Sequence, residues 1–226
     1  FLINCNASIS DTVFSENTAR HVKAEYANSG GGGISFQYGV GSLTNCTFIN
    51  NYSNGWCGGV SAHASELLLE DCSFVNNAGV MGGGFYLQNQ GTYSAVATLN
   101  NCTFEDNHVE GWWGGDEITG YNSRGAGIMM NGAYGGQCFL NNCNFTNNSA
   151  PDGLGGGVAC WSQVELGGIG VGLVASMCTL TNNSSTSGGA IWTDYVPVRG
   201  NPSGMTPIIQ YIDRLSDEDI VIVDRG

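Results

Sequence analysis

Residues 99–107 read Leu-Asn-Asn-Cys-Thr-Phe-Glu-Asp-Asn, and this unit decides the fold because it recurs along the chain. Six copies can be aligned on the aromatic position, at Phe14, Phe48, Phe74, Phe104, Phe145 and Leu180. An Asn follows three residues later, at Asn17, Asn51, Asn77, Asn107, Asn148 and Asn183. An apolar residue comes five residues earlier, at Ile9, Leu43, Leu69, Leu99, Leu140 and Ala175. Such repetition at a variable spacing predicts an array of stacked units joined by loops of different length.

Each copy continues into a glycine-rich step that leads into a further apolar segment. That segment begins at Ile34, Val60, Phe85, Ile128, Val158 and Ile191. The Leu and the Cys of a unit stand three residues apart, which would place them on opposite faces of one continuous strand. A sharp bend between them resolves the conflict, because Asn and Asp tolerate the left-handed backbone of a one-residue corner. We therefore expect corners at Asn45, Asp71, Asn101 and Asn142.

Three short strands separated by corners form one coil, and coils stack about 4.8 Å apart. The sequence thus predicts an all-β protein, a right-handed parallel β-helix of about six three-stranded rungs. Equivalent residues should form inward ladders, including Phe36/Ala62/Leu87/Met130/Cys160/Thr193 and the column from Phe14 to Leu180. The Asn after the third strand should stack amide on amide. We assign residues 1–195 to the helix, as a fragment of a longer chain, and residues 196–226 to a non-repeat extension.

The repeat also makes predictions for the cysteines and for the first rung. Cys46, Cys72, Cys102, Cys143 and Cys178 should form a column of stacked thiols, whose spacing exceeds that preferred by a disulfide. Cys57, in a loop, is the best candidate for a disulfide. Residues 1–5 should form a first strand with Ile3 and Cys5 inward. We expect more chain or another molecule to cover that end, as in a fibre.

The unit Asn-Cys-x-Phe-x-x-Asn resembles the parallel β-helix repeat of pectate-lyase-like proteins. Phe-x-x-Asn paired with Gly-Gly-Ala-Ile, found at residues 188–191, is similar to the repeat of polymorphic outer membrane proteins. The second resemblance implies an autotransporter passenger that acts as an adhesin. The chain departs from bacterial passengers in its nine Cys and its many glycosylation sequons.

Composition and charge exclude several classes of partner. The formal net charge is −13, with 19 acidic and 6 scattered basic residues, which argues against nucleic acid and anionic membranes. No apolar run is long enough to span a membrane. Eight sequons predict a glycosylated, extracellular or cell-surface protein. They begin at Asn6, Asn45, Asn51, Asn101, Asn144, Asn147, Asn182 and Asn183.

The alternative that the fold suggests is a polysaccharide-binding or polysaccharide-cleaving enzyme. Such enzymes need clustered carboxylates or a calcium site with a base. The outward positions of the third strand are Val13, Thr47, Ser73, Thr103, Asn144 and Thr179. Those of the first strand are Ser35, Ser61, Tyr86, Met129, Ala159 and Trp192. Neither stripe contains a carboxylate, Lys, Arg or His, so we assign no catalytic residue, no metal site and no cofactor.

The longest insertion, residues 105–124, carries Trp112 and Trp113 among acidic residues. The two indoles could stack on a glycan or contact a protein partner, or could simply pack over a neighbouring rung. The sequence predicts an extracellular structural or adhesive module of a surface fibre, filament or matrix. Its expected partners are other subunits of the assembly, with glycans as a further possibility.

Overall fold

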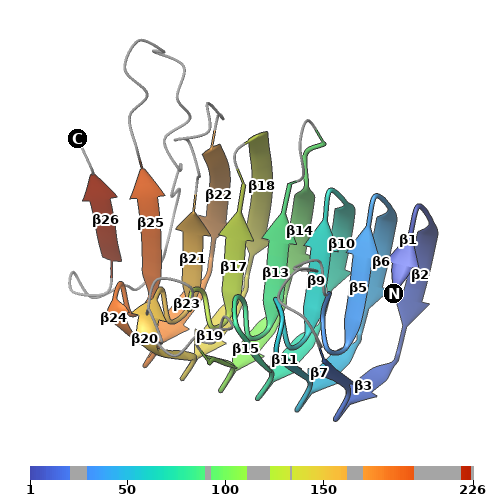
Figure 1. Ribbon diagram of the computed structural model, residues 1–226, viewed down its shortest axis with the longest axis horizontal. Coiled ribbons are helices and arrows are strands. Elements are labelled where there is room, and N and C mark those ends of the chain that lie inside the picture. The colour runs from blue at the N-terminus through green and yellow to red at the C-terminus, as the bar shows by residue number, and fades with distance from the viewer. Residues whose placement is uncertain are drawn as a thin grey trace.

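The computed structural model describes residues 1–20, 30–89, 93–110, 123–132, 134–161, 170–195 and 220–224. These residues form four parallel sheets and contain no helix. The strands of each sheet lie side by side along one axis, from the N-terminal rung to the C-terminal one (Figure 1). The prediction of a right-handed parallel β-helix of about six rungs is confirmed.

The first sheet has eight strands and the second has six. The first consists of β1 (Leu2–Ile3), β5 (Ile34–Gln37), β9 (Val60–His63), β13 (Phe85–Gln88), β17 (Ile128–Asn131), β21 (Val158–Trp161), β25 (Ile191–Tyr195) and β26 (Ile220–Asp224). The second consists of β2 (Asn6–Ser10), β6 (Val40–Thr44), β10 (Glu66–Glu70), β14 (Val96–Asn100), β18 (Tyr134–Asn141) and β22 (Gly170–Ser176).

The third sheet carries the aromatic position of the repeat, and a fourth sheet follows it. The third consists of β3 (Val13–Ser15), β7 (Thr47–Ile49), β11 (Ser73–Val75), β15 (Thr103–Glu105), β19 (Asn144–Thr146) and β23 (Thr179–Thr181). The fourth consists of β4 (Thr18–Ala19), β8 (Tyr52–Ser53), β12 (Ala78–Gly79), β16 (His108–Val109), β20 (Ser149–Leu154) and β24 (Ser184–Ser187). The sequence did not predict this fourth sheet, because four of its strands have only two residues and show no alternation.

The corners follow the expected chemistry. Asn45, Asp71, Asn101 and Asn142 all have positive φ, as predicted. A second row of left-handed residues separates the third and fourth sheets, one position before the repeated Asn. It comprises Glu16, Asn50, Asn76, Asp106, Asn147 and Asn182. The backbone therefore turns twice within seven residues of each unit, which isolates the three-residue strand that holds the Phe.

The interior consists of ladders of equivalent residues. Phe48 lies opposite Phe14 and Phe74, and Phe104 opposite Phe74 and Phe145, in the strand registers. Neighbouring rings in this column are stacked, with centroids 4.5–5.0 Å apart. The ladder from Ile34 to Ile191 is also in register. Burial of an apolar side chain at the same position of every rung makes the main favourable contribution to the stability of the coil.

The repeated Asn forms a continuous hydrogen-bonded ladder at the edge of this core. From Asn17 to Asn183, each amide Nδ2 donates to the Oδ1 of the next Asn at 2.8–3.0 Å. From Asn51 onward each Nδ2 also donates to the backbone carbonyl of a Phe in the preceding rung. The three central members, Asn77, Asn107 and Asn148, are fully buried. Their amides are therefore structural groups with fixed partners.

The predicted first strand differs from the structure in one detail. Leu2 pairs with Phe36 and packs on the interior, whereas Ile3 is 53% exposed, so the predicted inward position of Ile3 is wrong. The reason is a corner at Asn4, which shifts the strand by one residue. At the other end, residues 220–224 form β26, which pairs in parallel with β25 and continues the first sheet. The remainder of the extension, 196–219 and 225–226, lies outside the described residues.

Candidate functional site

The outer face of the first sheet is covered rather than open. Its outward positions, expected to form a stripe on the surface, are all buried. The apolar ones belong to a second cluster that is separate from the interior and includes Cys57, Val80 and Met81 from the segments between the fourth and first sheets. These segments fold over the sheet because the outward side chains Tyr86, Met129 and Trp192 are themselves large and apolar.

Aromatic and polar contacts stabilise this second cluster and the segments that contribute to it, which together we call the cover of the first sheet. The rings of Trp56 and Tyr86 are stacked 5.1 Å apart, and the ring of His63 lies 5.5 Å from Tyr86. Asn131 Nδ2 donates to Tyr86 Oη at 3.0 Å. Burial raises the pKa of the Tyr86 hydroxyl and lowers the pKa of His63 to about 4, so both groups are neutral near pH 7.

Arg124 places a positive charge within the same cover. Its side chain is only 4% exposed, and its guanidinium lies 3.9 Å from the ring centroid of Trp161 and 5.4 Å from that of Trp192. The backbone of Arg124 forms isolated bridges to Met81 and Leu154. The charge is thus held by aromatic faces on a fixed segment, as in a structural cation–π contact.

The thiols are placed as packing groups. Along the predicted column, each Sγ lies 3.3–3.5 Å from the carbonyl oxygen two residues earlier, as Cys72 does from Glu70. All nine cysteines are free. The prediction of a disulfide at Cys57 is wrong, because this thiol is fully buried and lies 3.2 Å from the Val60 carbonyl. Burial raises the pKa of Cys57, and raises that of Cys160 to about 12, so neither supplies a thiolate at neutral pH.

The sequons fall into two structural groups. Six of their asparagines are exposed: Asn6, Asn45, Asn101, Asn144, Asn147 and Asn182. Asn183 is half-buried and Asn51 is 1% exposed, and the side chains of both are members of the hydrogen-bonded ladder. The folded chain has no room for a glycan on Asn51, so that assignment is corrected. The sequon occurs at this position because the repeat requires an Asn there for the ladder.

The insertion of residues 105–124 is described only at its two ends. Trp112 and Trp113 lie outside the described residues. His108 Nε2 and Glu110 Oε1 are 3.5 Å apart at the surface of β16. Among the described residues, no three His, Cys, Asp or Glu side chains gather in an arrangement that could hold a metal ion.

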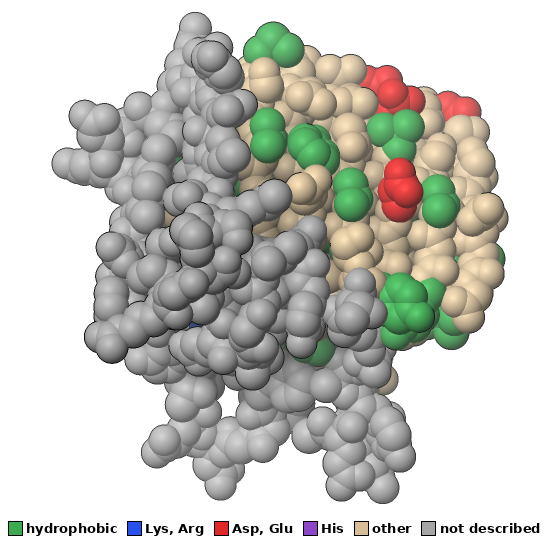
Figure 2. Space-filling model, turned by 90° about the horizontal axis from the view of Figure 1, so that it is seen from above, with side chains coloured by type: hydrophobic (Ala, Val, Ile, Leu, Met, Phe, Trp, Pro, Cys, Tyr) green, Lys and Arg blue, Asp and Glu red, His purple; other side chains and the backbone are tan. Residues whose placement is uncertain are grey.

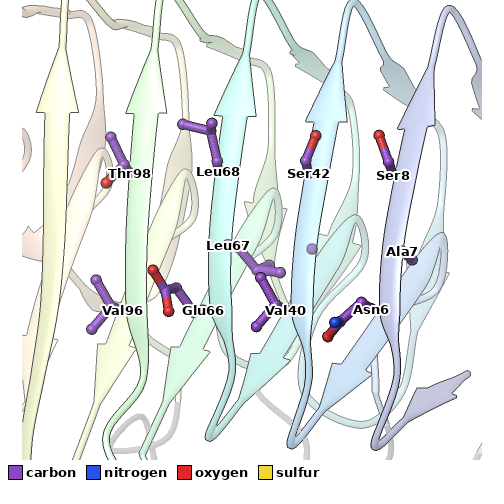
Figure 3. A pocket seen from close by; sticks show the side chains of 11 residues that line it. Asn6, Ala7, Ser8, Val40, Ser42, Glu66, Leu67, Leu68, Val96 and Thr98 are labelled. Carbon is purple, nitrogen blue, oxygen red and sulfur yellow. The ribbon is translucent and has the colours of Figure 1, made fainter.

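The outer face of the second sheet is a surface that the sequence analysis did not consider. Two parallel rows of side chains cross it: Asn6, Val40, Glu66 and Val96 form one, and Ser8, Ser42, Leu68 and Thr98 form the other (Figure 3). They line a shallow hollow of about 650 Å³. Seen from above, acidic and hydrophobic side chains are set among polar ones over the N-terminal rungs (Figure 2).

This face carries two carboxylates, Glu66 and Glu70, at the two ends of β10. Four residues of extended strand separate them by roughly 13 Å. Paired carboxylates that cleave glycosidic bonds lie about 5–9.5 Å apart. The two groups therefore do not form a catalytic pair. The Glu at both ends of the segment Glu-Leu-Leu-Leu-Glu, four residues apart, was the signal in the sequence that could have identified this outward row.

Comparison with known families places the repeat. The profile of the family described as "Right handed beta helix region" matches residues 2–183, which is most of the chain. The repeat described as "Chlamydia polymorphic membrane protein (Chlamydia_PMP) repeat" matches residues 177–194. No curated protein and no solved structure matches the chain. In the part of the chain that the structure describes, no helix has the length and apolar character needed to cross a bilayer.

Proposed function

Since this chain belongs to the right-handed β-helix family, we propose that it is a non-catalytic adhesive module exposed at a cell surface. The observation that carries the proposal is the match of residues 177–194 to the polymorphic membrane protein repeat. These residues contain β23, β24 and most of β25, which are three of the four strands of one rung of the helix. The other rungs share its design, so the chain is an array of units of this kind.

The last rung illustrates the shared design. Leu180 continues the aromatic column beside Phe145, and Asn183 accepts a hydrogen bond from Asn148 at 2.8 Å. Gly188 has a φ of +70°, as Gly125 and Gly155 have positive φ in the rungs before it. Ile191 pairs with Val158 in the first sheet. Leu180, Asn183 and Ile191 of the matched segment therefore hold the same places as their counterparts in the preceding rungs, and the positive-φ glycine recurs at Gly82, Gly125 and Gly155.

A non-catalytic role is supported by how the polar groups are used. The buried amides of Asn77, Asn107 and Asn148 are joined in the ladder, and burial raises the pKa of the Cys57 and Cys160 thiols. The thiols of the Cys column lie against backbone carbonyl oxygens, as Cys72 does against Glu70. The neutral His63 and Tyr86 are packed in the apolar cover of the first sheet. Groups that enzymes commonly use as nucleophiles or general bases are thus held here in structural contacts.

Two measurements test the proposal. Antibodies raised against the 226-residue chain should stain intact, unpermeabilised source cells, and beads coated with the chain should be retained on the surface to which those cells attach. Staining that requires permeabilised cells would refute the surface location. Incubation of the chain with neutral and acidic polysaccharides should release neither reducing ends nor unsaturated sugars. Release of either product would refute the non-catalytic assignment.

A further inference from the structure

A second hollow adjoins the one on the second sheet and widens it into a shallow groove. This hollow, of about 770 Å³, lies over the corner between the first and second sheets. Its lining includes Tyr38, Ser65, Tyr93 and Ser94, and both hollows share Asn6, Val40 and Glu66. The groove therefore runs across β2, β6, β10 and β14, along the axis of the helix.

An aromatic pair stands at the rim of the groove. The rings of Tyr38 and Tyr93 meet edge to face with centroids 5.6 Å apart, and Tyr93 is 64% exposed. A phenol ring with an accessible face and a polar tip suits a ligand that has both C–H faces and hydroxyl groups. Val40, 49% exposed, adds apolar surface to the groove floor.

The lining also contains several groups that can bond hydroxyls. Asn4, Asn6, Ser8, Ser42 and Thr98 supply amides and hydroxyls, each of which can donate and accept hydrogen bonds. A saccharide presents the same mixture of donors and acceptors around each ring. A ligand site in a protein commonly combines apolar contact area with a few polar groups that fix orientation, as this groove does.

Charge restricts the class of ligand. Glu66 is the one carboxylate in the described lining of both hollows, and none of the described lining residues is Lys, Arg or His. The chain as a whole has a formal charge of −13. An anionic polysaccharide would be repelled, so the groove suits an uncharged one.

The spacing of the rungs restricts its shape. Equivalent side chains recur about every 4.8 Å along the groove, which is the distance between neighbouring strands. This distance is close to the advance of one residue in an extended β-1,4-linked pyranose chain. Such a chain lying along the axis would meet one rung with each sugar, whereas an α-linked chain that coils would lose this register.

We propose that this groove binds a neutral, extended β-linked glycan, with Tyr93 as the stacking residue. The proposal rests on the adhesive function proposed above and names the ligand class for it. The site is distinct from the covered outer face of the first sheet. Asn6 begins a sequon and lines both hollows, so a glycan attached there would lie over the first rung.

Calorimetric titration of the whole chain, produced without N-glycosylation, tests the proposal. Cellohexaose should bind, while maltohexaose and the anionic hexagalacturonate should bind at least about tenfold more weakly. Replacement of Tyr93 by Ala should weaken cellohexaose binding about five- to tenfold. The matched control is Val13→Ala, at a residue 66% exposed on the third sheet, and it should leave the affinity unchanged.

Other outcomes would overturn the proposal. These are absence of cellohexaose binding up to about 10 mM, equal binding of maltohexaose, or equal effects of Tyr93→Ala and Val13→Ala. Binding of a lysine-rich peptide instead, lost in Glu66→Gln but kept in Glu105→Gln, would assign the groove to a protein partner. If beads coated with the chain adhere but cellohexaose does not bind, the glycan inference fails and the adhesive function stands. If cellohexaose binds but antibodies stain only permeabilised cells, the surface location fails and the groove stands.

Discussion

The interior column and the cover of the first sheet are both buried, yet they are built in different ways. In the column, Phe48, Phe74 and Phe104 occupy one position of successive rungs and stack on copies of themselves. In the cover, Trp56 stacks on Tyr86, and Arg124 lies against Trp161 and Trp192. These contacts of the cover differ from one rung to the next. Repetition therefore creates the core, and irregular loops create the second cluster.

The largest loss of stability should come from a cavity in the column of stacked Phe side chains. Phe74→Ala should lower the free energy of unfolding by about 3–5 kcal/mol, because rungs held in register on both sides cannot collapse into the cavity. Phe74 is completely buried, whereas Thr103 on the neighbouring strand is exposed. Thr103→Ala should cost less than about 0.5 kcal/mol. Equal losses in denaturant unfolding would show that the faces of the third sheet are assigned the wrong way round.

Two adjacent methionines allow the stability of the interior and that of the cover to be compared directly. Met130 points into the interior and Met129 into the cover, and both are fully buried. We expect Met129→Ala and Met130→Ala each to cost about 2–4 kcal/mol. Denaturant unfolding of the two variants measures the difference. A much smaller loss for Met129→Ala would mean that the cover is looser than the interior.

The next largest loss of stability is expected from the Asn ladder. Asn107→Ala removes the partner of Asn77 and of Asn148 and leaves the Phe74 carbonyl without its side-chain donor, so it should cost about 2–3 kcal/mol. Asn76 donates its amide to Asn50 in an exposed pair. Asn76→Gly is therefore the matched control, because glycine keeps the left-handed backbone that Asn76 adopts at its corner, and its expected cost is below about 1 kcal/mol. Similar melting temperatures for both variants would contradict a structural role for the buried ladder.

The cover should respond to mild acid through His63. Its pKa is about 4 in the folded chain, against 6.5 for an exposed imidazole, so the unfolded chain binds more protons between these pH values. The loss of stability is absent well above pH 6.5 and grows as the pH falls, reaching about 2 kcal/mol between pH 7 and pH 5. His63→Gln should remove this part of the pH dependence. Parallel stability curves for the two proteins would show that His63 is solvated in the native state.

Sequence reasoning succeeded where a position is determined by its copies in other rungs. The Phe column, the Asn ladder and the corner at Asn101 could be predicted because each rung needs the same side chain at the same place. The fourth sheet could not, since two-residue strands such as β12 have no period. The cover could not either, because successive copies of the repeat stand from 26 residues apart (Phe48 to Phe74) to 41 (Phe104 to Phe145). The sequence of a single loop does not indicate which sheet the loop will cover.

The candidate surface was missed for a related reason. The groove depends on the second strand, whose outward residues are not repeated: Asn6, Val40, Glu66 and Val96 differ in size and charge although they are paired in register. Its aromatic rim comes from Tyr38 and Tyr93, which occupy corner segments rather than strands. Only the stacking of the rungs brings these residues together, so the site is a property of the three-dimensional array.

The Asn ladder also has a direction. Each Oδ1 faces the preceding rung and each Nδ2 faces the following one, from Asn17 to Asn183. The amide dipoles therefore add head to tail, and each bond polarises the next. A rung presents the same acceptor to the unit before it and the same donor to the unit after it. Whole units can thus be inserted or deleted without altering the joint between neighbours, whereas reversing one amide would break the chain of dipoles on both sides.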